Sequence, residues 1–463
     1  MQLQQQVAFL RRQYLQDGDL PFSNVLSEKI VAQALTAVNR CWLDRIYSPL
    51  VTLSVFLGQV LSADHSCRAS VARLIAQRLS QGQRACSAET SAYCQSRKRL
   101  PEAFFSDVAR RTGRALEADV GPNWLWKHRR VYVYDGSSVS MPDTPQNQHD
   151  YPQPDTQKPG LGFPMARIAV VFSLACGAVL DLGICRYAGK GQSELGMLRK
   201  LWDLFLPGDV LLADSMMCAW TEIASLKQRG VDCVCRLNRS NRRADFSRGQ
   251  CLSDGDHIVT WLKPTKPRSI DRMTYAALPE SLTIRECRVQ VEQPGFRVKT
   301  LVVATTLLDP IAFSKDDLAQ LYRARWNAEL DLRSLKRTLQ MDVLRCKTPE
   351  LVRKEIWTHI LAYNLIRTIM AQAAKKHDIE PRSVSFKGAV QTLEAFQPVI
   401  ALPCQHDSTT NLYQELLDAI ATHRVADRPN RYEPRLRKRR PKHYGFLKKP
   451  RQQTKRDMAN GLL

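Results

Sequence analysis

The chain has 463 residues, of which 44% are hydrophobic. At roughly 150 residues per domain this length corresponds to about three domains with well-packed cores, which excludes a short peptide, a fibre and a wholly disordered chain. Lys and Arg outnumber Asp and Glu by 68 to 45, which gives a net charge of +23. This basic balance favours a polyanionic partner such as nucleic acid.

Hydropathy and cysteine usage predict a soluble protein of the cytoplasm without membrane contact. The first residues, Met1–Phe9, lack the basic start and apolar stretch of a secretory signal. The longest apolar stretch, Ile168–Leu180, is shorter than the roughly 18 residues that a membrane span needs. Thirteen cysteines, an odd number spread from Cys41 to Cys404, favour reduced and mostly buried thiols over a disulfide framework.

Residues 1–120 are predicted to form a helical amino-terminal domain. Val71, Leu74 and Ile75 recur at helical intervals within one segment, and a second helix is expected after Ser87. The second helix carries side chains that would suit a DNA-contacting helix pair, namely Tyr93, Ser96, Arg97, Lys98 and Arg99. The alternative is an ordinary helical domain with a solvated basic face.

Residues 121–236 predict the first part of an α/β domain. Val131–Tyr134 is a run of β-branched and aromatic residues that reads as a strand ending on Asp135. Two more strands, 166–174 and 178–188, are expected to be joined by a turn, after which Ser193 caps a helix to about Leu206. A short strand then ends at Asp214, and a further helix and strand follow, so the order β-β-β-α-β-α-β predicts a mixed, helix-flanked sheet.

The remainder of the chain predicts three further regions. Residues 237–308 show strands without helices, at 258–262, 282–291 and 299–306, and form a β insertion. Residues 309–400 complete the α/β domain, with one long helix from Ser314 to about Gln340 and another from Pro349 to about Lys376. Residues 401–463 form a carboxy-terminal helix and a basic tail.

The tail holds about half of the net charge. Between Arg428 and Arg456 thirteen Lys or Arg stand against one acid, Glu433, which gives 13 − 1 = +12. Four prolines in the same stretch favour an extended chain that becomes ordered on a partner.

Zinc is not predicted from the cysteines and histidines. Cys233 and Cys235 alternate along a strand, but no second pair lies at zinc spacing, and Cys404 and His406 are likewise alone. None of the nine histidines forms an H-x-x-x-H pair.

The segment 321–336 carries an unusual set of charges on one side of its predicted helix. At about 100° per residue, five side chains fall within an arc of about 80°. They are Tyr322, Arg325, Glu329, Arg333 and Lys336. The alternative is a solvated helix face held by pairs between Glu and basic residues.

Two acids at strand ends favour a site over a solvated face. Asp135 and Asp214 each follow a strand of one predicted sheet, and Glu329 can approach from a helix packed on it. Three carboxylates without His or Cys form an oxygen-only ligand set, which suits Mg²⁺ or Mn²⁺. Two such ions about 4 Å apart can clamp the attacking and leaving oxygens of a phosphodiester.

With a metal site at the three acids, the basic residues beside Glu329 are expected to bind DNA phosphates. Arg325, Arg333 and Lys336 would hold the phosphates that flank the scissile one, and Tyr322 could stack on a base or hydrogen-bond a phosphate.

At these residues the sequence resembles the bacterial insertion-sequence transposases of the DDE type, in the family named for insertion sequence four. The signature of that family is Tyr, two residues, Arg, three residues, Glu, six residues, Lys, and Tyr322, Arg325, Glu329 and Lys336 match it without a gap. The segment from Asp135, with Asp-Gly-Ser-Ser and a Met-Pro-Asp-Thr-Pro continuation, resembles the first acidic motif. Asp214 occupies the place of the second acid.

The resemblance implies an RNase H-like catalytic core with Asp135, Asp214 and Glu329 as ligands of two Mg²⁺ or Mn²⁺ ions. It also implies a metal-dependent DDE transposase that moves a DNA element by cut and paste at terminal inverted repeats, through a hairpin intermediate. Similar enzymes act as homodimers on double-stranded DNA, with the amino-terminal region reading DNA and the carboxy-terminal region aiding assembly. The implied location is the bacterial cytoplasm, on the nucleoid when bound to DNA.

Two alternatives remain at the level of sequence. Another nuclease or integrase on an RNase H-like core could carry the same three acids. A DNA-binding protein could also retain a transposase scaffold and no longer cut.

Overall fold

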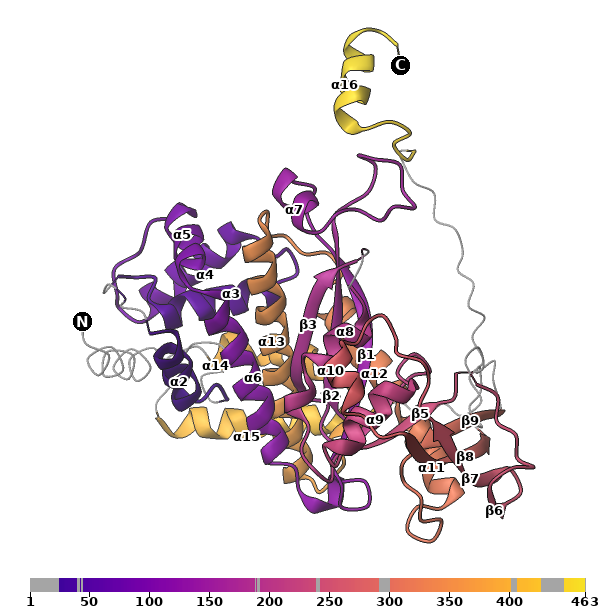
Figure 1. The fold of residues 1–463 in the computed structure, drawn as a ribbon. Coiled ribbons are helices and arrows are strands. Elements are labelled where there is room, and N and C mark those ends of the chain that lie inside the picture. Colours follow the sequence, from indigo (N-terminus) through magenta and orange to yellow (C-terminus); the bar gives the residue numbers. More distant parts are fainter. Residues whose placement is uncertain are drawn as a thin grey trace.

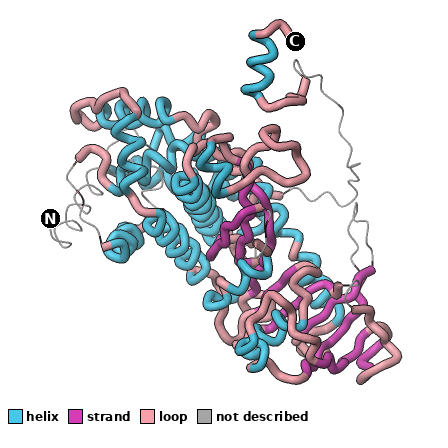
Figure 2. The backbone as a smooth tube through the Cα atoms, turned by 45° about the horizontal axis from the view of Figure 1, so that its top comes forward, coloured by secondary structure: helices cyan, strands magenta, loops and turns pink. Residues whose placement is uncertain are grey.

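The computed structural model describes residues 25–39, 42, 45–187, 189, 192–238, 242–290, 300–400, 406–425 and 445–462. Helices gather at one end of the molecule and the strands of the β insertion at the other, with a helix-covered sheet between them (Figures 1 and 2). Most of the basic tail, residues 426–444, and the Cys404 and His406 side chains lie outside the described residues. No described helix has the length and apolar content to cross a membrane.

The amino-terminal region is helical, as predicted. Ser48 and Ser66 cap two of its helices by accepting a backbone N–H with their hydroxyl groups. The helices are α2 (Glu28–Val38), α3 (Pro49–Leu61), α4 (Cys67–Ser80), α5 (Ser91–Arg99) and α6 (Glu102–Ala118). Helix α3 is buried over most of its length, so the bundle packs around it.

The prediction that α5 presents Tyr93, Ser96 and Arg97 to DNA is wrong, because all three side chains are buried. Arg97 donates to Gln59 Oε1 at 3.2 Å, and its guanidinium lies 4.5 Å from the centroid of the Tyr93 ring. These residues therefore hold α5 onto α3. Lys98 and Arg99 are exposed.

The described strands form one nine-stranded sheet in the order β3-β2-β1-β4-β5-β9-β8-β7-β6. The first five strands are β1 (Val131–Ser140), β2 (Met165–Ser173), β3 (Val179–Arg186), β4 (Val210–Ala213) and β5 (Asp232–Arg236). Strands β1, β2 and β3 form an antiparallel meander, whereas β4 is parallel to both β1 and β5. The mixed sheet is confirmed, and so is the predicted order of elements, except that a short helix, α7 (Pro145–Asp150), lies in the predicted loop between β1 and β2.

Two boundaries in this region differ from prediction. Strand β1 continues through Asp135 to Ser140, because its second half remains paired with β2 up to Ser140 opposite Met165. Ser193 does cap a helix, α8 (Glu194–Arg199), but this helix ends early and a 3-10 turn at Trp202–Leu204 follows. Helix α9 (Trp220–Gln228) then leads into β5.

The predicted β insertion extends the same sheet. Its strands are β6 (Gln250–Ser253), β7 (Asp256–Leu262), β8 (Ser281–Gln290) and β9 (Thr300–Thr305), with an unpredicted short helix α10 (Arg272–Ala276). Strand β9 pairs antiparallel with β5 and so joins the two halves of the sheet. Fully buried Arg285 binds Asp256 and donates to the carbonyl oxygen of Phe313 at 2.6 Å, which ties the insertion to the start of the next helix.

The long helix predicted from Ser314 is broken into three parts. Ser314 begins α11 (Lys315–Ala324) with a capping box shared with Asp317. Helix α12 (Trp326–Arg333) follows after a break at Arg325, and a π-helical turn, η3 (Ser334–Thr338), ends the segment.

Helix α13 (Pro349–Lys376) agrees with the prediction and is the central helix of the fold. Apolar side chains on one face of the sheet pack with α3, α6 and α13, and those on the other face pack with α8 and α9. Strand β1 shows the alternation, since Val131 and Val133 face the first cluster while Tyr132 and Tyr134 face the second. The remaining described helices are α7 (Pro145–Asp150), α14 (Phe386–Ile400), α15 (His406–Thr422) and α16 (Arg451–Ala459), with 3-10 turns at Pro122–Trp124 and Pro381–Ser383.

The cysteines of the described residues are free thiols, and most of them are buried, as predicted. Cys233 and Cys235 both lie in the second apolar cluster, which agrees with their expected position on one face of a strand.

Candidate active site

Parallel pairing brings Asp135 and Asp214 to the same level of the sheet. Val133 of β1 lies opposite Leu212 of β4, and each acid is two residues further along its strand direction. Side chains two residues apart point to the same face of a strand, so Asp135 shares the face of Val133. That face packs against α12.

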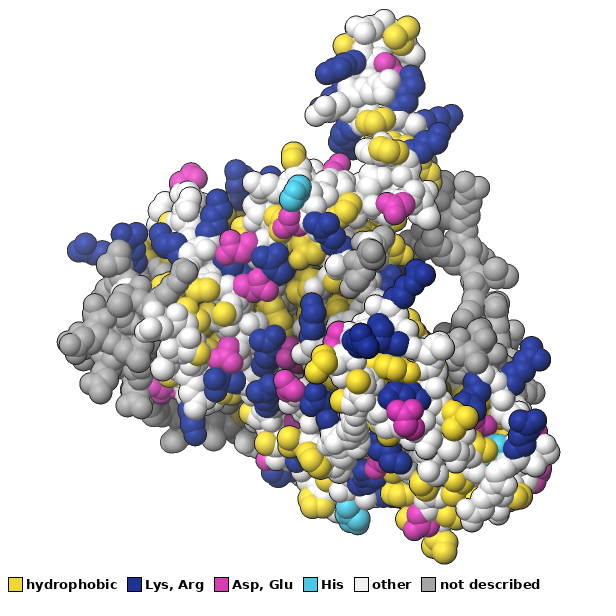
Figure 3. Space-filling view, viewed as in Figure 1, with side chains coloured by type: hydrophobic (Ala, Val, Ile, Leu, Met, Phe, Trp, Pro, Cys, Tyr) yellow, Lys and Arg dark blue, Asp and Glu magenta, His cyan; other side chains and the backbone are white. Residues whose placement is uncertain are grey.

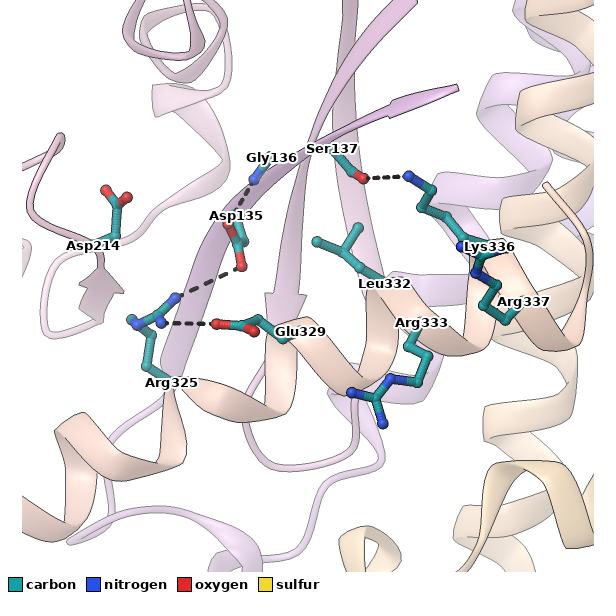
Figure 4. Close-up of a pocket in the computed structure, with 10 residues that line it drawn as sticks. All are labelled: Asp135, Gly136, Ser137, Asp214, Arg325, Glu329, Leu332, Arg333, Lys336 and Arg337. Atoms are coloured by element: carbon teal, nitrogen blue, oxygen red, sulfur yellow. Dashed lines mark hydrogen bonds and ion pairs between the residues drawn. The ribbon is translucent and has the colours of Figure 1, made fainter. Parts of the chain in front are cut away.

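Helix α12 delivers the third acid. Glu329 lies in the first turn of α12 and lines a cleft of about 480 Å³ together with Asp135 and Asp214. The residues that line this cleft are Asp135, Gly136, Ser137, Asp214, Arg325, Glu329, Leu332, Arg333, Lys336 and Arg337 (Figure 4). The cleft therefore brings together six of the seven predicted site residues, all except Tyr322.

Arg325 lies between two of the acids (Figure 4). Its Nη1 atom is 3.7 Å from Asp135 Oδ2, and its Nη2 atom donates to Glu329 Oε1 at 3.2 Å. The Arg325 side chain is only 16% exposed, so this end of the segment is not the solvated helix face of the alternative interpretation, whereas Arg333 is exposed. Arg325 neutralises part of the negative charge of the cleft.

Burial raises the pKa of Asp135 to about 6. Arg325 and the N–H of Gly136, which donates to Asp135 Oδ1 at 2.9 Å, oppose this shift, whereas Asp214 and Glu329 reinforce it. A carboxyl group with a raised pKa and nearby acids is typical of a functional site.

The donor atoms of the cleft fit a hard divalent cation, because all three predicted ligands are carboxylates. Among the described residues, however, the three carboxylates do not come within 4.8 Å of one another as one ligand group. The Arg325 guanidinium contacts both Asp135 and Glu329 and so lies between these two acids.

The other end of the cleft is basic. Lys336 donates to Ser137 Oγ at 3.0 Å, and burial lowers its pKa. Arg333 and Arg337 line the same end, and Arg337 also pairs with Asp342 at 3.0 Å. The prediction did not include Arg337, because an ideal helix places it about 100° from Lys336.

Tyr322 does not line the cleft. Its side chain is 8% exposed and belongs to the apolar cluster between the sheet and α13, and burial raises its pKa to about 12. The Arg325 guanidinium lies 6.0 Å from the centroid of the Tyr322 ring. Tyr322 therefore lies against Arg325 on the core side, away from the cleft, and is not placed to stack on a base.

Glu194 is a fourth acid near the cleft that the sequence did not indicate. A Cβ atom at Gly136 would lie 2.5 Å from the carboxyl carbon of Glu194, so a side chain at position 136 would displace the end of the Glu194 side chain. Burial raises the pKa of Glu194, Arg167 at 4.0 Å lowers it, and Asp214 raises it. In the sequence Glu194 is only an acid in the first turn of a capped helix, which is common without any functional role.

Comparison with known proteins gives a family for the chain. The model of the transposase DDE domain family matches residues 126–365, which include all three acids. The chain is 28% identical over 294 residues to the transposase InsG of insertion sequence element IS4 from Escherichia coli strain K12. That alignment spans 62% of this chain and 62% of InsG.

Two other similarities cover different extents of the chain. The transposase of insertion sequence element IS421 from Escherichia coli is 38% identical over 82 residues, or 18% of this chain and 21% of that protein. A piggyBac transposase in a synaptic complex with hairpin DNA aligns with 86% of this chain and 84% of its own, at a TM-score of 0.44 and 10% identity. Because the family match covers more than half of the residues, the chain belongs to the transposases with a DDE domain.

Proposed function

We propose that this protein is a DNA transposase that moves an insertion sequence by cutting and joining phosphodiester bonds at terminal inverted repeats. The main support is the cleft that combines Asp135, Asp214 and Glu329 with a row of basic side chains. Acids alone would repel a DNA strand, whereas this arrangement can hold phosphates beside a metal site. Family membership supports the same activity.

Asp135, Asp214 and Glu329 would hold two Mg²⁺ or Mn²⁺ ions. When bound, such ions supply an activated water and stabilise the leaving oxygen in in-line displacement. Arg325 would give up its contact with Asp135 or Glu329 and turn to a phosphate of the DNA. Its guanidinium can bind a phosphate through two N–H groups.

The basic end of the cleft would position the strand. Arg333, Lys336 and Arg337 would bind phosphates that flank the scissile one, and Ser137 would orient the Lys336 ammonium through the hydrogen bond already present. Burial lowers the pKa of Lys336 because the ammonium loses contact with water. A phosphate beside it would supply an opposite charge and so stabilise the ammonium, which favours phosphate binding.

The regions of the chain would divide the remaining tasks. We infer that β3-β2-β1-β4-β5 with α12 and α13 form an RNase H-like core, extended at one edge by the β insertion. The helices of residues 1–120 would contact DNA through exposed groups such as Lys98 and Arg99, not through Arg97. Lys and Arg side chains spread over the face shown in Figure 3, which suits a polyanionic partner. The tail would add DNA contacts or aid assembly of a homodimer on two element ends, on the nucleoid of the cytoplasm.

A cleavage assay tests this proposal. Purified protein is incubated with labelled duplexes from the two ends of its element and with Mg²⁺, and the products are separated on a denaturing gel. Asp135→Asn, Asp214→Asn and Glu329→Gln should each abolish cutting and leave DNA binding intact. Asp316→Asn is a matched control, since Asp316 is an exposed acid at the start of α11.

The products separate the alternatives. Hairpin ends support transposition, whereas nicks without hairpins support another nuclease or integrase. Binding without any cleavage supports a DNA-binding protein that no longer cuts. Near-normal cleavage by one of the three variants would remove that residue from the site.

A further inference from the structure

A second group of metal-ligating side chains lies away from the cleft, where the amino-terminal helices meet α13. His65 follows α3, and Glu355 and His359 are one turn apart on α13. One ligand atom from each of the three lies within 4.8 Å of the other two. All three side chains are buried, with exposed fractions of 4%, 2% and 1%.

His359 has no hydrogen-bond partner for either ring nitrogen among the described residues. His65 Nδ1 is likewise without a partner, and the two rings lie 5.8 Å apart between centroids. A buried imidazole always carries at least one N–H or lone pair that needs a partner, so an unpaired one is costly. A ligand between these nitrogens would remove that cost.

Glu355 is held in position for such a ligand. Its carboxylate accepts the backbone N–H groups of Arg345 and Cys346 at 2.8 to 3.1 Å. Each carboxylate oxygen has two lone pairs, so these bonds leave others free for a metal. Gln59 fixes the loop of His65 in a similar way, by donating to the His65 carbonyl oxygen at 2.9 Å.

We propose that His65, Glu355 and His359 bind one Zn²⁺ ion that joins the amino-terminal helices to α13. Two imidazoles and one carboxylate are a ligand set that zinc favours, whereas Mg²⁺ prefers oxygen alone. The backbone N–H groups of Arg345 and Cys346 orient the Glu355 carboxylate, as the hydrogen-bond partners of zinc ligands usually do. The site is separate from the acidic cleft and does not depend on the function proposed for it.

The experiment measures zinc bound to the full-length protein. After purification, chelation and re-addition of Zn²⁺, dialysed wild-type protein should hold one zinc per chain by atomic emission. Zinc should also raise the melting temperature by roughly 5 °C at saturating concentrations. His359→Leu, which replaces the unpaired ring with an apolar side chain, and His65→Gln should both lose this zinc and the shift. Circular dichroism is recorded for each variant to check that it remains folded.

Two controls assign the ion to this site. His257 is also a buried histidine, but its nitrogens bind the Arg248 carbonyl oxygen and Glu286, so His257→Gln should keep the zinc. A triple variant of the acidic cleft, Asp135→Asn with Asp214→Asn and Glu329→Gln, should keep it as well. The proposal is overturned if wild-type protein binds no zinc, if folded His359→Leu retains it, or if the triple variant loses it.

Discussion

Replacing Asp135 with Asn should stabilise the protein while it abolishes cleavage. The pKa of Asp135 is raised from 3.8 to about 6, mainly by burial. The folded protein therefore keeps a proton that the unfolded chain releases between about pH 4 and pH 6. In this window the free energy of unfolding falls as the pH rises, and the full loss is present above pH 6.

The size of the effect follows from the same pKa. At about 1.4 kcal/mol per pKa unit, ionised Asp135 costs the folded state at most about 3 kcal/mol. Asn is neutral and can still accept the N–H of Gly136, so it removes the cost of ionisation. We expect Asp135→Asn to increase the free energy of unfolding by about 1 to 3 kcal/mol at pH 7.5. The gain should shrink as the pH falls from 7 to 5.

Urea denaturation followed by circular dichroism, with EDTA present, measures this difference across the pH range. Asp331→Asn is the matched control, because buried Asp331 pairs with Arg367 and Arg382. Removing that charge leaves two guanidinium groups without their carboxylate, so it should destabilise the protein by about 3 kcal/mol. If Asp135→Asn destabilised the protein at pH 7.5, or its gain did not depend on pH, the reasoning about burial would be refuted.

Three further changes test the surroundings of the cleft. Lys336→Ala should weaken DNA binding for all sequences and reduce the slope of log affinity against log salt by about 1, and an unchanged slope would argue against a phosphate contact. Gly136→Ala should push the Glu194 carboxylate away from the cleft, and any loss of cleavage that results should be partly restored by Glu194→Ala in the same chain; a loss that this second change does not rescue would show that the contact is not the cause. Truncation after Asp427 removes thirteen Lys or Arg and two acids, Glu433 and Asp457, which is a net charge of 13 − 2 = +11. It should reduce non-specific DNA affinity in a filter-binding assay, and an undiminished affinity would show that the tail does not contribute to DNA binding.

Much of the fold was predictable because its elements carry strong local patterns. The β-branched run at Val131–Tyr134 and the cap at Ser314 mark element starts that the structure confirms. The end of β1 was not predictable, because Gly136 and the serines after it have low strand propensity. Their pairing with β2 over the whole hairpin decides the outcome, and it depends on contacts that are distant in sequence.

The candidate site was predictable in its acids and less so in its surroundings. Asp135, Asp214 and Glu329 line one cleft because strand register and helix packing bring them together. Tyr322 was expected on the same helix face as Glu329, but its ring is buried in the apolar cluster of the core. Glu194 lies next to Gly136 at the edge of the cleft, and no spacing in the sequence predicts this contact.

Because of the π turn at Ser334–Thr338, the position of Lys336 depends on the number of residues in this helix as well as on its charge. Leu339 donates its N–H to the Ser334 carbonyl oxygen five residues back, so the winding there is wider than in α12. Lys336 and Arg337 both lie within this turn, and both line the cleft. Deleting a single residue from the turn would restore ordinary winding and swing the ammonium away from Ser137, even with every charged residue retained. The number of residues between Glu329 and Lys336 is therefore constrained by geometry, whereas the identity of most side chains between them is not.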